Sequence, residues 1–224
     1  MNQRFLLAVA LVAASLVALG LLVVDVPLAH WIHDSGYESD ARVVQGLGLL
    51  DHVFGLKVWY WIAVAIFVPL GLVGLALTPR LRLPHGLAGS ILAAGLAQGI
   101  TIGLMILGKN LFGRLRPQQL FESGDWSTLW FSGGGSFPSG HAAFYFGLLL
   151  PLAACTPRIW QRVVLMGIAM FVAVARLDMA RHFLSDVALS VLLAAAASLL
   201  VGRLLRRFLP AHPDAGLPVL RAHD

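Results

Sequence analysis

The run FLLAVALVAASLVALGLLVV, residues 5–24, decides the fold class, because it is uncharged, apolar and long enough to cross a bilayer as one helix. A helix needs about 20 residues to span the hydrocarbon core. Two later runs, residues 58–77 and 87–107, are equally free of charge. The first run exceeds the apolar core of a secretory signal, which is roughly 7–15 residues, so we expect a retained helix rather than a cleaved leader.

Three further apolar runs follow, at residues 142–155, 163–175 and 187–201. Each reaches spanning length only if the adjoining polar residues belong to the same helix. We therefore predict an all-α integral membrane protein, a bundle of six transmembrane helices over residues 1–208. Residues 27–57 are expected to form an interfacial helix or a structured loop, and residues 209–224, which contain three prolines, a mobile cytoplasmic tail.

The composition supports a membrane protein, with 58% hydrophobic and 12% charged residues and a mean hydropathy of +0.82. Soluble domains carry roughly a quarter charged residues. These values argue against a cytosolic globular protein, a nucleic-acid binder and a disordered chain. The single cysteine, Cys155, cannot form an internal disulfide and is expected to be a packing residue.

The basic residues indicate the orientation. With six spans, the side that carries both termini holds nine of the 16 Lys and Arg residues and only two acidic residues, whereas the other side is mildly acidic. The positive-inside rule then places both termini in the cytoplasm. The glycines Gly95, Gly99 and Gly103, spaced four apart, predict a close helix contact within one chain or between two, so the oligomeric state stays open.

Chemistry-bearing residues gather on the extracytoplasmic side in this topology. Three cations, two histidines and one acid come from four separate helix ends: Lys109, Arg116, His141, Arg176, His182 and Asp186. Each of these residue types has a role if the ligand is a phosphate. The guanidinium and ammonium groups would neutralise the phosphoryl oxygens. The glycine-rich segment 133–140 leads into a helix N-terminus, where backbone N–H groups and the helix dipole favour an anion.

The two histidines suggest the catalytic roles. His182 and Asp186 are four residues apart, so we expect them on one face of the sixth helix, with the carboxylate orienting the imidazole. His182 is therefore the candidate nucleophile. His141 begins a different helix and is the candidate proton donor, because histidine titrates near physiological pH.

These positions form a three-part pattern: Lys109-x6-Arg116-Pro117, Pro138-Ser139-Gly140-His141 and Arg176-x5-His182-x3-Asp186. The pattern resembles the signature of the type 2 phosphatidic acid phosphatase superfamily, whose membrane branch has six spans. In one departure, Ala175 stands where the third motif often has serine, which removes at most one hydrogen bond.

The resemblance implies a role for each matching position. Lys109, Arg116 and Arg176 would bind the phosphate, and Ser139 with the Gly140 amide would stabilise the transition state. His182 would attack phosphorus to form a phosphohistidine with Asp186 behind it, and His141 would serve as general acid and then as base. The scheme needs no metal and no cofactor, because three fixed cations neutralise the charge.

The resemblance implies a hydrolase that removes a phosphate or pyrophosphate from a lipid at the outer side of the cytoplasmic (inner) membrane. Candidate substrates are phosphatidylglycerol phosphate, phosphatidic acid, undecaprenyl pyrophosphate and the phosphate of lipid A. The segment 118–137 is expected to select the headgroup. Two alternatives stay open: a lipid phosphotransferase using the same site, and a non-enzymatic transporter or lipid-binding protein.

Other polar and aromatic residues have simpler interpretations. Arg114 and Arg181 are expected to be interfacial anchors or partners of catalytic groups. His30, His33 and His52 are expected to be solvated loop residues, because they match no diagnostic metal-binding spacing. Six aromatic residues near span ends are expected to be headgroup-level anchors: Trp59, Tyr60, Trp61, Trp126, Trp130 and Trp160.

Overall fold

The computed structural model describes residues 1–35, 41–81 and 85–208, and within these ranges every regular element is a helix. The α-helices are α1 (Gln3–Leu19), α2 (Asp25–Asp34), α3 (Ala41–Val53), α4 (Ile62–Leu81), α5 (His85–Phe112), α6 (Pro117–Ser123), α7 (Gly140–Cys155), α8 (Ile159–Asp178) and α9 (Leu184–Phe208). A π-helical turn, η1 (Gly20–Val24), joins α1 to α2, and a short 3-10 helix, η2 (Trp126–Thr128), follows α6. The expected all-α class is confirmed for these residues.

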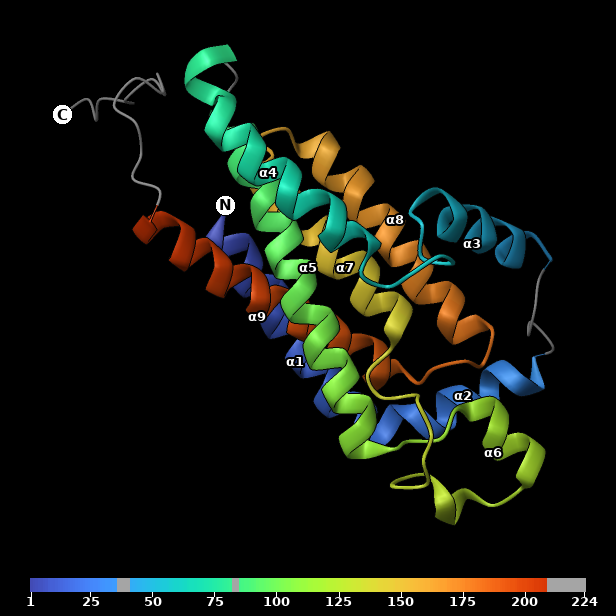
Figure 1. Cartoon of the computed structure of the whole chain (residues 1–224). Coiled ribbons are helices and arrows are strands. Elements are labelled where there is room, and N and C mark those ends of the chain that lie inside the picture. Colours follow the sequence, from blue (N-terminus) through green and yellow to red (C-terminus); the bar gives the residue numbers. More distant parts are fainter. Residues whose placement is uncertain (36–40, 82–84, 209–224) are drawn as a thin grey trace.

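The helices α5, α7 and α9 pack against one another and form the centre of the bundle. Each central helix carries one outer helix: α4 lies on α5, α8 on α7 and α1 on α9 (Figure 1). The residues of α7 are almost all buried, which matches its apolar composition on every side. The neighbouring helices α5, α8 and α9 therefore hold α7, and the residues at its N-terminus, in place.

Four helical segments are long and apolar enough to cross a membrane, namely Gln3–Asp34, Gly86–Ser123, Ile159–Asp178 and Leu184–Arg207. They contain four of the six predicted spans. The other two predicted spans correspond to shorter apolar helices, Ile62–Thr78 and Gly140–Cys155. The count of six and the cytoplasmic position of the termini stay predictions, and the expected mobile tail 209–224 lies outside the described residues.

The predicted close contact of small residues lies within the chain. A Cβ built on Gly95 would come 2.9 Å from the backbone nitrogen of Val68 in α4, and one on Gly71 would come 2.6 Å from that of Leu92 in α5. Gly99 also faces α4, where Val64 lies 3.7 Å from its built Cβ, whereas Gly103 has nothing within 4 Å. Glycine lets the backbones of α4 and α5 approach closely, as small residues do in membrane helices.

The helices α2, α3 and α6 are surface elements outside this bundle (Figure 1). The α2 helix lies against the segment that contains α6 and η2, because His30 stacks on Trp126 with ring centroids 4.8 Å apart and His33 stacks on Phe121 at 4.0 Å. His30, His33 and His52 are exposed, as expected, but they lie in the helices α2 and α3 and not in loops. The α3 helix lies beside α8 and completes the predicted interfacial region.

Candidate active site

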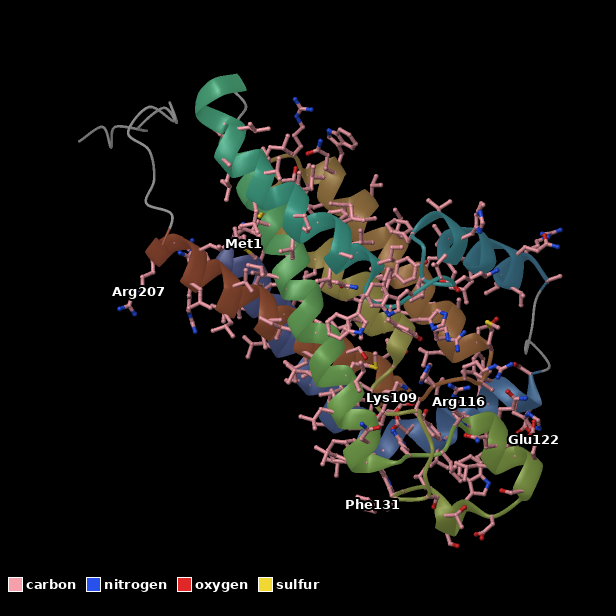
Figure 2. The ribbon with its side chains drawn as sticks, in the orientation of Figure 1. Met1, Lys109, Arg116, Glu122, Phe131 and Arg207 are labelled. Carbon is pink, nitrogen blue, oxygen red and sulfur yellow. The ribbon has the colours of Figure 1, made fainter. Side chains whose placement is uncertain are left out.

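The residues of the three sequence motifs come together at one end of the bundle. Figure 2 shows Lys109 and Arg116 toward this end, and Met1 and Arg207 toward the other. The motif residues come from the last turns of α5 and α8, the residue before α6, and the residues just before and at the start of α7 and α9: Lys109, Arg116, Ser139, Gly140, His141, Arg176, His182 and Asp186. Helix ends, rather than helix middles, therefore supply this site.

The glycine-rich segment lies directly on the backbone that follows α5. The amide of Gly134 donates to the Gly113 carbonyl at 2.9 Å, and the amide of Ser136 donates to the Arg114 carbonyl at 2.9 Å. A Cβ on Gly134 would come within 2.2 Å of that Arg114 oxygen, so only glycine permits this approach. The Lys109 ammonium donates to the Gly135 carbonyl, which holds the cation beside the segment.

Ser139 connects the start of α7 to the start of α9. It is the N-cap of α7, and its hydroxyl accepts from the Ala142 amide at 3.4 Å. Its own amide donates to the Asp186 carbonyl at 3.0 Å, and its carbonyl accepts from the Ser190 hydroxyl at 2.8 Å. Because the Ser139 hydroxyl is an acceptor in the cap, its own O–H can donate to an anion at the helix N-terminus.

His182 lies before α9 and not within it, so the expectation that His182 and Asp186 share a helix face is wrong. The nearest acceptor of His182 Nδ1 is the Ser136 carbonyl, at 2.9 Å, whereas Asp186 Oδ2 is 3.5 Å away. A carbonyl only accepts, so Nδ1 carries the proton and Nε2 keeps the lone pair. This is the tautomer that an Nε2 nucleophile requires.

Asp186 orients His182 mainly through two neighbouring residues, Phe183 and Ser136. Its carboxylate accepts from the Phe183 amide at 2.8 Å and from the Ser136 hydroxyl. These two bonds hold the residue after His182 and the residue whose carbonyl binds His182 Nδ1. The carboxylate thus fixes the residue that follows His182 and the residue that binds its Nδ1, and both determine where the imidazole lies.

Burial lowers the pKa of His182 to about 4. The Asp186 carboxylate opposes this shift, and the positive charges of Arg176 and Lys109 add to it. Removal from water disfavours the charged imidazolium ion. His182 is therefore neutral, and able to act as a nucleophile, throughout the neutral pH range.

The three cations are close enough to repel one another. Arg176 experiences the positive charges of Arg116 and Arg181, and Lys109 those of Arg116 and Arg176. Arg176 is 9% exposed, and its Nε has no hydrogen-bond acceptor among the described residues. Grouping like charges in a partly buried site is unfavourable unless an anion joins them, so this arrangement is suited to a phosphate.

His141 has a carboxylate partner that the sequence interpretation missed. Its Nε2 lies 3.1 Å from Asp51 Oδ2, and the Tyr145 hydroxyl donates to Asp51 Oδ1 at 2.9 Å. Burial raises the pKa of Asp51, but the hydrogen bonds from His141 and Tyr145 and the charge of Arg176 outweigh it, so the net shift is downward. Asp51 is therefore ionised at neutral pH. Asp51 is a single acid within α3, so the sequence around it does not indicate that it pairs with His141.

Arg114 forms a buried ion-pair network beneath the site. Its two terminal nitrogens lie 2.7 Å from Asp186 Oδ1 and 2.8 Å from Asp25 Oδ2. The Ser185 hydroxyl accepts from Arg114, and the Ser185 amide and hydroxyl donate to Asp25. All three charged side chains are at most 3% exposed. The expectation of an interfacial anchor is wrong for Arg114, which is buried. The alternative expectation, a partner of a candidate catalytic group, agrees with its ion pair with Asp186.

Two of the expected headgroup anchors, Trp126 and Trp130, are half-buried and pack on other side chains. The Arg114 guanidinium lies 4.4 Å from the ring centroid of Trp130 and 4.0 Å from that of Phe183. Trp126 packs on His30 and Phe121. Trp59 and Trp160 are more than half exposed, as an anchor requires.

Comparison with known families agrees with this geometry. The model of the PAP2 superfamily matches residues 86–209, which is more than half of the chain. The chain belongs to the PAP2 superfamily. No match was found among curated proteins or among solved structures. The family resemblance expected from the motifs is thereby confirmed, and membership supports a phosphatase that acts on phosphate esters.

The PAP2 match begins with α5 and ends after α9, so it contains every motif residue. Asp25 and Asp51, which bind Arg114 and His141, lie before it. A groove of about 840 Å³ lies at the other end of the bundle, where Met1, Gly86, Trp160 and Arg206 line it. This groove contains none of the motif residues, which lie at the end that holds His182.

Proposed function

We propose that this PAP2 protein is a membrane lipid phosphatase that removes a terminal phosphate or pyrophosphate group through a phosphohistidine on His182. The reaction would take place on the extracytoplasmic face of the cytoplasmic membrane. The observation that carries the proposal is the arrangement around His182: a buried neutral imidazole, with Nδ1 bound to a carbonyl, in the electrostatic range of Arg176 and Lys109.

In the first step, the Nε2 lone pair of His182 attacks phosphorus, and the bond from phosphorus to the lipid oxygen breaks. His141 donates a proton to that oxygen as it leaves. Lys109, Arg116 and Arg176 compensate the phosphoryl charge, which is where most of the rate enhancement in phosphoryl transfer arises. The Ser139 hydroxyl and the Gly140 amide, at the N-terminus of α7, donate to the same oxygens.

In the second step, a water molecule attacks the phosphohistidine while His141 takes the proton of that water. The bond between phosphorus and Nε2 breaks, and inorganic phosphate leaves with His182 neutral again. Each proton that His141 gives in the first step is recovered in the second. The cycle closes without a metal ion.

A lipid substrate suits a site built from helix ends. Its acyl or prenyl chains can remain in the bilayer while the phosphate reaches the cations at the membrane surface. Phosphatidylglycerol phosphate, phosphatidic acid, undecaprenyl pyrophosphate and the phosphate of lipid A all have this form. The segment 118–137, which lies beside the site, is where we place headgroup selection.

The test is phosphate release by the purified protein from a panel of these lipids in detergent micelles. We expect release by the wild type to survive EDTA and to fall by at least about 10³-fold in His182→Ala, which removes the nucleophile. Arg203→Ala, at an exposed position at the far end of α9, is the matched control. Loss of release in EDTA that is restored by added metal would contradict the metal-free mechanism.

The same samples separate the two other functions. A lipid phosphotransferase would pass the labelled phosphoryl group to an added lipid hydroxyl, so free phosphate as the sole product would exclude it. A transporter or lipid-binding protein would keep its function in His182→Ala. Acid-labile label retained on the wild type after rapid quenching, and absent from the variant, is the result that a phosphohistidine predicts.

A further inference from the structure

The contact between Asp51 and His141 joins two elements that the family motifs do not connect. Asp51 lies on α3, a surface helix that lies outside the residues matched by the PAP2 model. Its side chain is nevertheless buried, at 9% exposure, and both of its oxygens are in use: Oδ2 faces His141 Nε2 and Oδ1 accepts from Tyr145. Tyr145 is one helical turn after His141, so the three side chains form one contiguous group.

This contact determines which nitrogen of His141 can exchange a proton with the substrate or with water. The ionised Asp51 carboxylate only accepts, so Nε2 carries a proton toward it and Nδ1 is the nitrogen that exchanges protons. His182 has the opposite arrangement, because its Nδ1 is bound to the Ser136 carbonyl and its Nε2 is reactive. The two histidines therefore present different nitrogens, each determined by a different acceptor.

We propose that Asp51 is a positioning residue for His141: it holds the ring so that Nδ1 faces the leaving oxygen and stabilises the imidazolium that donates the proton. The inference rests on the proposed phosphatase function and adds a residue of α3 to it. It parallels the way a buried aspartate holds the histidine of a serine protease triad.

The charges around His141 explain why a carboxylate is needed there. Burial opposes protonation of the imidazole most, and the cations Arg176, in α8, and Arg116, before α6, oppose it further. Tyr145 and Tyr60 complete the surroundings. The Tyr60 hydroxyl lies beside the start of α7, 2.9 Å from a Cβ built on Gly140. Asp51 is the one negative charge that acts on His141 among these neighbours.

The proton balance follows the two steps of the proposed reaction. The imidazolium has N–H groups at both nitrogens, and Nδ1–H goes to the lipid oxygen when the bond from phosphorus to that oxygen breaks. The neutral ring keeps Nε2–H bound to Asp51. Nδ1 then takes a proton from the attacking water, and Asp51 stays ionised throughout.

The experiment compares Asp51→Asn with wild type on two substrates and measures kcat/KM, which reports the step that forms the phosphohistidine. On a lipid phosphate, whose alkoxide needs a proton to leave, we expect a loss of about 10- to 100-fold, part of the 10²–10⁴-fold that a general acid contributes. On p-nitrophenyl phosphate, whose phenolate leaves without a proton, we expect a loss below about 3-fold. Asp34→Asn, an exposed carboxylate at the end of α2, is the control and should match wild type on both.

The pH profile gives a second readout. Without the carboxylate, the imidazolium loses its proton more readily, so the alkaline limb of the Asp51→Asn profile should move to lower pH. Tyr145→Phe removes the hydrogen bond to Asp51 Oδ1 and leaves the whole carboxylate charge to His141, so its alkaline limb should move to higher pH. Opposite shifts are not expected from a loss of packing, and Tyr145→Phe keeps the test valid if Asp51→Asn folds poorly.

A double-variant cycle shows whether Asp51 acts through His141. In a His141→Ala background, Asp51→Asn should change kcat/KM on the lipid phosphate by less than about 2-fold, because its partner is already absent. Equal losses on both substrates, an unmoved alkaline limb or multiplicative effects in the cycle would overturn the positioning role. If wild type releases no phosphate from any ester, the proposed function itself fails, which is a separate outcome.

Discussion

Replacing Arg114 with methionine tests the buried network beneath the candidate active site. Arg114 is 2% exposed and pairs at 2.7 and 2.8 Å with two carboxylates, Asp186 and Asp25, that are themselves 0% and 3% exposed. Methionine fills a similar volume but leaves both carboxylates without their cation. Removing one partner of a buried ion pair costs about 3–5 kcal/mol, because an uncompensated charge stays buried.

We expect Arg114→Met to lower the free energy of unfolding by about that amount. The loss can be measured by reversible denaturant unfolding in detergent with tryptophan fluorescence, since Trp130 lies 4.4 Å from the guanidinium. Arg203→Met, which changes an exposed arginine of α9, should cost less than about 0.5 kcal/mol.

The Asp25→Asn change in the Arg114→Met background extends the test. Neutralising one of the two stranded carboxylates should recover part of the lost stability, so the double variant should be more stable than the sum of the two single effects. A cost below about 1 kcal/mol for Arg114→Met, or simple additivity in the double variant, would refute the view that these charges depend on one another.

Three further predictions follow from the same geometry. Gly134→Ala should abolish phosphatase activity or folding, because its Cβ would lie 2.2 Å from the Arg114 carbonyl oxygen, whereas Gly103→Ala, with nothing within 4 Å, should retain both in activity and thermal-melting assays. Because burial lowers the pKa of His182 to about 4, below its unfolded value near 6.5, folded-state stability should be full above pH 6.5 and fall toward pH 4; melting temperatures should show a smaller fall in His182→Gln. Inorganic phosphate should inhibit competitively, and Lys109→Met should raise its inhibition constant at least about 10-fold, since an ammonium–phosphate contact is lost; an unchanged constant would place Lys109 outside the anion site.

The sequence by itself determined the helical class, the apolar segments and the family. Those features depend on local information: the length of an uncharged run, the position of a glycine or proline, and the spacing within a motif. Because the motif residues stand at helix ends on one side of the predicted topology, their gathering at one end of the bundle also followed from segment lengths. The number of spans and the side of the membrane stay predictions.

Tertiary structure alone decided the partners of the catalytic candidates. Asp25 meets Arg114 across 89 residues of chain, Asp51 meets His141 across 90, and Arg114 meets Asp186 across 72. Such pairs depend on how far each helix is shifted and rotated against its neighbours, which no local pattern encodes. The π-helical turn Gly20–Val24, for example, alters the helical register just before Asp25, whose carboxylate then accepts from the Ser185 amide at the start of α9.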